Sequence, residues 1–195
     1  MIFSRLLADL SFLSLFFIPM GTVALAHGFI LKYDLFPFLK LPLDLGWTFR
    51  GKRILGDNKT VRGVLVHIVF SVLGTYCSQY VQTWLFPWSI SILDLSFRWL
   101  EVGLMLGIGM SLGELPNSFI KRQLGIRPGE RSTGYLRGFF FIMDQVDMVL
   151  GIWLFFFLFL KLPVKLFFIS LILCLILHPT VTWIGYKLRM RRTPH

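Results

Sequence analysis

Long apolar runs alternate with polar loops along this chain, and the runs have the length of membrane-spanning helices. About 20 consecutive apolar residues are needed to cross the hydrocarbon core of a bilayer as a helix. Five such runs cover about residues 6–32, 61–86, 99–116, 146–162 and 164–187. The pattern therefore predicts an all-α integral membrane protein with five transmembrane helices.

The composition supports the membrane assignment. Of the 195 residues, 55% are hydrophobic and 21 are Phe, and the mean hydropathy is +0.71, which is unusual for a soluble domain. Arg5 precedes the first apolar run as in a signal peptide, but no clear small-x-small cleavage site ends that run. We therefore expect residues 1–195 to form a single polytopic membrane domain.

Positive charges are unevenly distributed among the loops. Sixteen of the 20 Lys and Arg residues lie in the loops after the first and third runs and in the C-terminal tail. By the positive-inside rule, the N-terminus is predicted outside and the C-terminus in the cytoplasm, in the cytoplasmic (inner) membrane. The loops at about 33–60 and 117–145 are then cytoplasmic and are expected to form the active site. The formal net charge of +10 indicates anionic head groups of the lipid bilayer and nucleotide phosphates as partners, rather than nucleic acid.

The first basic loop ends in the order Gly-Asp-x-Lys-Thr-x-x-Gly, from Gly56 to Gly63. Glycines let backbone N–H groups approach phosphate oxygens, and a helix N-terminus favours an anion. Lys59 and Arg62 are three apart and share one face of a helical turn. The alternative is an ordinary basic loop that contacts lipid head groups.

The second basic loop is flanked by carboxylates. Glu114 closes an apolar run, where a carboxylate must be paired, protonated or metal-bound. Lys121 and Arg122 follow it, and Asp144 and Asp147 stand three apart further on. Two carboxylates about 5–6 Å apart can hold Mg²⁺. The alternative is that Asp144 pairs with an arginine and that Asp147 is a charge near a helix N-terminus.

The remaining polar and small residues in the apolar runs favour structural interpretations. The third run contains Gly103, Gly107, Gly109 and Gly113, whose spacing allows close helix approach; for the first two we expect packing alone. His27 and His67 have no ligand partners at a recognisable spacing, so packing or a hydrogen bond is expected for each.

Taken together, the two loops resemble the CDP-archaeol synthase family, within the wider group of CTP:phosphatidate cytidylyltransferases. Lys59-Thr60-Val61-Arg62-Gly63 is similar to a Lys-Thr-x-x-Gly element of that group. The segments 118–122 and 144–147 are similar to its Ser-x-x-Lys-Arg and Asp-x-x-Asp signature. The resemblance covers nearly the whole chain. One departure is Glu114, where the family pattern usually has Asp.

The resemblance implies a membrane cytidylyltransferase that transfers CMP from CTP to a lipid phosphate with Mg²⁺. It implies a metal site at Asp144 and Asp147, with Glu114 as a further ligand or support. It also implies that phosphates are neutralised by Lys59, Arg62, Lys121 and Arg122. The further nucleotide-binding candidates are Gly56, Asp57, Thr60, Gly63, Ser118 and Arg127.

Three questions stay open at this point. The lipid is either phosphatidic-acid-like or an archaeal-type ether lipid. The segment 130–141 is either a basic connector or a lid over the nucleotide. The alternative function is a non-catalytic lipid-phosphate binder or transporter, and association into a homodimer is also left open.

Overall fold

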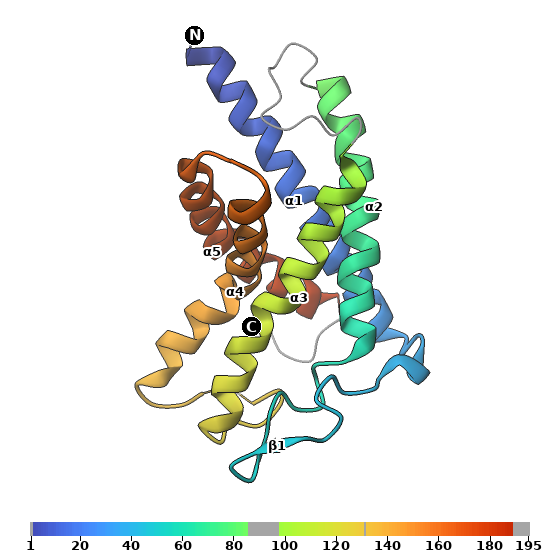
Figure 1. Cartoon of the computed structure of the whole chain (residues 1–195), viewed down its shortest axis with the longest axis vertical. Helices are drawn as coiled ribbons and strands as arrows, with labels where there is room; N and C mark the ends of the chain where they lie inside the picture. The colour runs from blue at the N-terminus through green and yellow to red at the C-terminus, as the bar shows by residue number, and fades with distance from the viewer. Residues whose placement is uncertain (1, 86–97, 131, 189–195) are drawn as a thin grey trace.

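A computed structural model shows a bundle of long helices and describes residues 2–85, 98–130 and 132–188. The helices of the bundle are α1 (Ile2–Lys32), α2 (Val61–Leu85), α3 (Trp99–Gln123), α4 (Leu136–Phe159) and α5 (Val164–Lys187) (Figure 1). Within the described residues, four segments are long and apolar enough to cross a membrane: Ala8–Lys32, Val61–Trp84, Leu136–Phe159 and Val164–Lys187. The predicted helical membrane protein is thus confirmed, while α3 is not among these four segments.

Helix α3 lies between α2 and α4, and glycines bring its backbone against both neighbours (Figure 1). A Cβ added at Gly103 would lie 2.6 Å from the Cα of Val72 on α2. A Cβ added at Gly109 would lie 2.6 Å from the Cα of Ile152 on α4. Gly107 meets α2 in the same way, so the packing role expected for Gly103 and Gly107 is confirmed. Close contact on both sides fixes the position of α3, which carries Glu114 and Lys121.

An aromatic core joins α1 to α4. Phe12 and Phe16 of α1 are fully buried with Trp153 and Phe156 of α4, and the rings of Phe12 and Trp153 lie 5.9 Å apart between centroids. The Trp153 Nε1–H donates to Ser170 Oγ of α5 at 2.7 Å. This hydrogen bond satisfies the only polar atom of the indole in an otherwise apolar core.

Helices α1 and α5 run in the same direction and are joined at both ends. Near their N-terminal ends, Lys165 Nζ lies 2.7 Å from Asp9 Oδ1. At their C-terminal ends, Lys32 Nζ donates to the carbonyl oxygen of Leu188 at 3.4 Å. The C-terminal ends of α1 and α5 therefore lie together at one end of the bundle, and the N-terminal parts of these helices lie together toward the other.

The segment between α1 and α2 folds around Asp44. It contains a single helical turn, η1 (Pro37–Leu39), and a short antiparallel hairpin of β1 (Thr48–Phe49) and β2 (Lys52–Arg53). Asp44 accepts hydrogen bonds from Arg53 Nη2 at 2.5 Å and from the backbone N–H of Leu55 and Gly56 at 2.8 and 2.9 Å. The Arg53 guanidinium, together with these N–H groups, holds the pKa of Asp44 well below its usual range.

The hairpin docks on the C-terminal end of α3. Lys52 Nζ donates to the carbonyl oxygen of Gln123 at 2.5 Å, and Gln123 Nε2 donates to the carbonyl oxygen of Arg53 at 3.3 Å. Figure 1 shows the hairpin at the same end of the bundle as the last turn of α3 and the first turn of α4. Both loops flagged by the sequence therefore meet at one end of the molecule.

The helices around the second loop are longer than the sequence pattern predicts. Helix α3 continues to Gln123, and α4 already begins at Leu136, so much of the expected loop 117–145 is helical. The predicted start of the fourth run at residue 146 is wrong, because α4 begins ten residues earlier, at Leu136. The predicted loop at 130–141 is wrong for its residues from Leu136 onward, which are helical. The prediction followed the apolar run alone, whereas the charge of Asp144 inside the helix is satisfied by partners on α3.

Candidate active site

Lys59 and Glu114 form an ion pair that joins the first loop to α3. Their side chains are only 18% and 20% exposed. Glu114 was expected to be paired, protonated or metal-bound, and the structure shows the first of these. Because Lys59 lies just before α2, the pair anchors the Gly-Asp-x-Lys-Thr segment against α3.

Asn117 bridges the two aspartates of α4. Its Nδ2 donates to Asp144 Oδ1 at 2.7 Å and to Asp147 Oδ2 at 2.8 Å. Lys121, one turn further along α3, donates to both oxygens of Asp144 at 2.5 and 2.6 Å. The two carboxylates thus converge on α3, as their spacing of three residues predicts for a helix.

The donor set of Asn117, Asp144 and Asp147 fits a hard divalent cation. Such ions prefer carboxylate and amide oxygens, and Asn117 Oδ1 is buried without a hydrogen-bond partner in the described part of the chain. Among the described residues, no group of three or more His, Cys, Asp or Glu side chains is placed to hold a metal ion. Glu114 contacts Lys59 instead, so its metal role stays a prediction.

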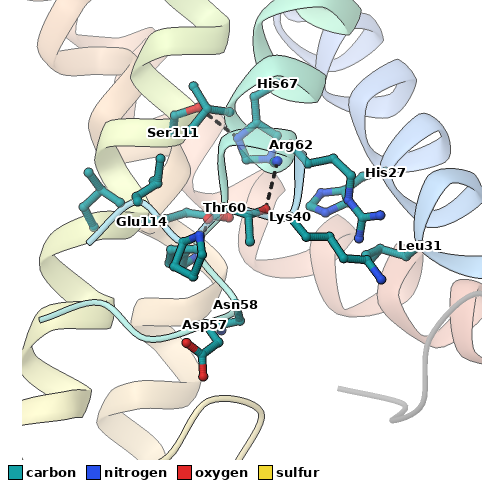
Figure 2. Close-up of a pocket in the computed structure, with 16 residues that line it drawn as sticks. His27, Leu31, Lys40, Asp57, Asn58, Thr60, Arg62, His67, Ser111 and Glu114 are labelled. Atoms are coloured by element: carbon teal, nitrogen blue, oxygen red, sulfur yellow. Dashed lines mark hydrogen bonds and ion pairs between the residues drawn. The ribbon is translucent and has the colours of Figure 1, made fainter. Parts of the chain in front are cut away.

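A cavity of about 530 Å³ lies beside this group, between α1, α2, α3 and the first loop. Six residues singled out from the sequence line it: Asp57, Lys59, Thr60, Arg62, Gly63 and Glu114. Figure 2 shows His27 and His67 on the helical side of the cavity. His67 Nδ1 lies 3.2 Å from Ser111 Oγ, which agrees with the hydrogen bond expected for this residue.

Arg62 occupies a different place from the one expected for a phosphate-binding side chain. It is buried, and its Nη1 donates to Asp34 Oδ1 at 3.0 Å and to the carbonyl oxygen of Leu35 at 2.8 Å. It thereby ties the exit of α1 to the start of α2. Its guanidinium lines the cavity but is already engaged, so phosphate binding by Arg62 stays a prediction.

Arg122 has the opposite character. It is 7% exposed, and its Nε and Nη1 atoms are buried with no hydrogen-bond partner among the residues that the structure describes. Arginine keeps its charge in proteins, and a buried charge without a partner is costly. This guanidinium is therefore suited to bind an anion.

Gly56 allows the two loops to approach Arg122. A Cβ at this position would lie 2.8 Å from Pro128 Cγ and 3.4 Å from Arg122 Cδ. Its φ of +88° also favours glycine over any other residue. The glycine picked out from the sequence thus has a steric reason in the folded chain.

The predicted residues fall into two neighbouring groups. The cavity group contains Lys59 and Glu114, while Ser118, Lys121, Arg122, Arg127, Asp144 and Asp147 do not line the cavity. The helix backbones connect the two groups, because a Cβ added at Gly113, next to Glu114, would collide with the carbonyl oxygen of Asp147 on α4. The structure therefore brings the acids and bases of both loops into two groups that share α3, one of which lines the cavity.

Sequence reasoning missed Asn117. Its partners lie 27 and 30 positions away, so no local spacing reveals them. The available signal was the spacing from Glu114. Asn117 follows it by three positions, so the amide lies on the same face of the helix as the Glu114 carboxylate.

Comparison with known proteins gives consistent results. A family model described as CarS-like, CDP-archaeol synthase, matches residues 7–195. The CDP-archaeol synthase of Methanospirillum hungatei JF-1 is 34% identical over 163 residues, which are 79% of this chain and 89% of the relative. That of Sulfolobus acidocaldarius is 27% identical over 81% of this chain and 86% of the relative.

One solved structure shares the fold. It is described as an intramembrane enzyme for archaeal membrane lipid biosynthesis, and it aligns with a TM-score of 0.55. The alignment covers 83% of this chain and 91% of the other, at 20% sequence identity. At this identity the likeness concerns the arrangement of the helices.

Proposed function

The chain belongs to the CarS-like CDP-archaeol synthase family, and on this premise we propose how its residues act. The protein is a CTP-dependent membrane cytidylyltransferase that forms a CDP-lipid. The lipid phosphate oxygen bonds to the α-phosphorus of CTP, the bond from that phosphorus to the β-phosphate breaks, and pyrophosphate leaves. A non-catalytic lipid-phosphate binder is not favoured.

The observation that carries the proposal is Arg122, which follows Lys121 of the Lys121–Asp144 pair on α3. Its Nε and Nη1 are buried without a hydrogen-bond partner in the described part of the chain. Phosphoryl-type transfers are catalysed mainly by positioning and by neutralising charge. We assign Arg122 to a phosphate of CTP, with Lys121 moving from Asp144 to a second phosphate when the nucleotide binds. Lys59 would neutralise the reacting phosphates from the cavity side.

Asp144 and Asp147 are proposed to hold Mg²⁺, with Glu114 as a support, because its neighbour Gly113 packs against the backbone of Asp147. The ion, when bound, would draw negative charge from the triphosphate and orient it. The chain itself supplies the frame, because Asn117 fixes both carboxylates and the glycines of α3 fix the distance to α4.

The lipid is proposed to be an archaeal-type ether lipid phosphate, which is supported by the names of the relatives. Purified protein, labelled CTP and a panel of lipid phosphates, with the products resolved by mass, test this directly. We expect a CDP-lipid and pyrophosphate with the ether lipid phosphate. Use of ordinary phosphatidic acid alone would overturn the lipid assignment, and no CTP-dependent product with any lipid would overturn the function.

We further propose five membrane crossings, with the N-terminus outside and the active site and C-terminus on the cytoplasmic side. The charge distribution supports this orientation, and so does the parallel direction of α1 and α5. In a chain with Cys77 and Cys174 replaced by Ala, Lys52→Cys should react with an impermeant thiol reagent only from the cytoplasmic side. Glu101→Cys should react only from outside, and labelling of both from one side would refute the topology. A homodimer stays a prediction.

A further inference from the structure

The Asn117 side chain lies where the two carboxylates of α4 converge. Its Nδ2 is 2.7 Å from Asp144 Oδ1 and 2.8 Å from Asp147 Oδ2, and the residue is 5% exposed. Two neighbouring carboxylates, here the buried Asp147 and the half-exposed Asp144, repel each other unless something positive lies between them. The amide NH₂ group, with its partial positive charge, lies between the two carboxylates and reduces their repulsion, as a bound cation would.

The other end of the same amide is left without a partner. Asn117 Oδ1 is buried and accepts no hydrogen bond within the described ranges. A buried carbonyl oxygen normally has a partner, so each exception requires an explanation. Rotation about the terminal side-chain torsion, which is broad and roughly two-fold for Asn, would exchange this oxygen with the nitrogen without moving the helix.

In the rotated orientation, Oδ1 would face Asp144 and Asp147. Three oxygens turned toward one another are unfavourable alone and favourable around a hard cation, which prefers oxygen ligands. Glu114, the third carboxylate of the predicted metal site, is held by Lys59. Asn117 lies three positions along the same helix and is already in contact with both aspartates.

We propose that Asn117 is a ligand of the divalent cation held by Asp144 and Asp147, and that its amide turns over when the cation binds. Resting on the magnesium centre of the proposed function, this inference adds a residue that the sequence motif does not include. It assigns the amide two states: without the cation, Nδ2 bridges the carboxylates; with it, Oδ1 joins them as a third protein oxygen.

The test is metal binding by the detergent-solubilised full chain, without CTP or lipid. Mn²⁺, which prefers the same oxygen ligands, is titrated by electron paramagnetic resonance, and the rise in melting temperature with Mg²⁺ is recorded beside it. The variants are Asn117→Ala and Asn117→Asp. Gln79→Ala is the matched control, because Gln79 also carries a buried amide oxygen without a described partner but lies on α2.

Asn117→Ala should weaken Mn²⁺ binding by about ten- to a hundredfold, the usual loss around metal sites, and should reduce the Mg²⁺-induced rise in melting temperature. Asn117→Asp restores an oxygen ligand, so it should bind Mn²⁺ at least as tightly as wild type and show a larger Mg²⁺-induced rise. The control should match wild type in both measurements.

A purely structural bridge predicts a different result. Asn117→Ala would then melt earlier with and without metal, at an unchanged Mn²⁺ affinity, and that result would overturn the inference alone. If Asn117→Ala does not fold, Asn117→Asp decides, because Mn²⁺ binding ten times weaker than wild type would also overturn it. Wild-type protein that binds no Mn²⁺ would overturn the proposed magnesium centre together with the inference.

Discussion

Lys121 contacts both carboxylate oxygens of Asp144, at 2.5 and 2.6 Å, between the C-terminal end of α3 and the N-terminal part of α4. The Lys121 side chain is 14% exposed and that of Asp144 is 45% exposed. The pair is therefore open to water on one side, where a nucleotide can reach it. In the proposed function, Asp144 exchanges this contact for the metal ion and Lys121 exchanges it for a phosphate.

Asp144→Asn should abolish CDP-lipid formation and leave the protein folded. The amide keeps the shape of the side chain but loses the charge that binds a cation, so we expect a fall in turnover of at least about a hundredfold. Pyrophosphate release is measured beside the melting temperature. Glu101→Gln, at an exposed acid paired with Arg98 near the start of α3, is the control and should keep full activity. Wild-type turnover by Asp144→Asn would contradict the metal assignment.

The Lys59–Glu114 pair should show strong coupling in a double-mutant cycle. Lys59→Met leaves the Glu114 carboxylate without a counter-charge, and Glu114→Gln does the converse, so each should destabilise the fold. The double variant should recover part of the loss, with a coupling free energy of about 1–3 kcal/mol. Unfolding in detergent measures it. Additive effects would show that the ion pair does not fix the first loop.

Gly109→Ala should destabilise the bundle and impair activity together. The added Cβ would lie 2.6 Å from the Cα of Ile152, so α3 and α4 must separate, at a cost of about 1–3 kcal/mol. The same shift would move Asp147 away from Asn117. Gly21→Ala is the matched control, because nothing lies within 4 Å of its Cβ, and it should be neutral or slightly stabilising. Equal melting temperatures for the two variants would contradict the close packing.

Asp44 should make the stability of the first loop depend on pH. Its pKa is lowered in the folded protein by Arg53 and by backbone N–H groups, so its contribution is fully present above the unfolded pKa of about 4. That contribution is lost as the pH falls below this value toward the folded pKa. Asp44→Asn should therefore melt earlier than wild type at pH 7, and the gap should shrink between about pH 5 and pH 3. A gap that stays constant down to pH 3 would contradict this origin.

The roles that depend on the spacing of residues within one helix could be predicted from the sequence. The roles that depend on partners distant in the sequence could not. Gly103 and Gly107 were predicted correctly because small residues at helical spacing point to one neighbouring helix. The convergence of Asp144 and Asp147 followed from their three-residue separation. Arg62 was assigned to a phosphate because nothing in the pattern shows that Asp34 and Leu35 return to it at the end of α1.

The start of α4 illustrates the same limit. The apolar pattern predicts that the fourth membrane segment begins at residue 146, after Asp144. In the folded chain, Lys121 and Asn117 contact that carboxylate, so α4 extends back to Leu136. A hydropathy pattern includes the cost of placing the charge in an apolar segment, but it contains no information on the α3 residues that offset this cost.

The link between Asp9 and Lys165 has a consequence for biogenesis. The fifth helix leaves the ribosome after the other four, and its Lys165 is the partner of a carboxylate on the first helix. Until that lysine arrives, Asp9 lacks its counter-charge in apolar surroundings, which is costly. The first helix therefore gains this counter-charge only after the fifth has been made, and a product cut before Val164 would keep an unpaired acid in its first segment.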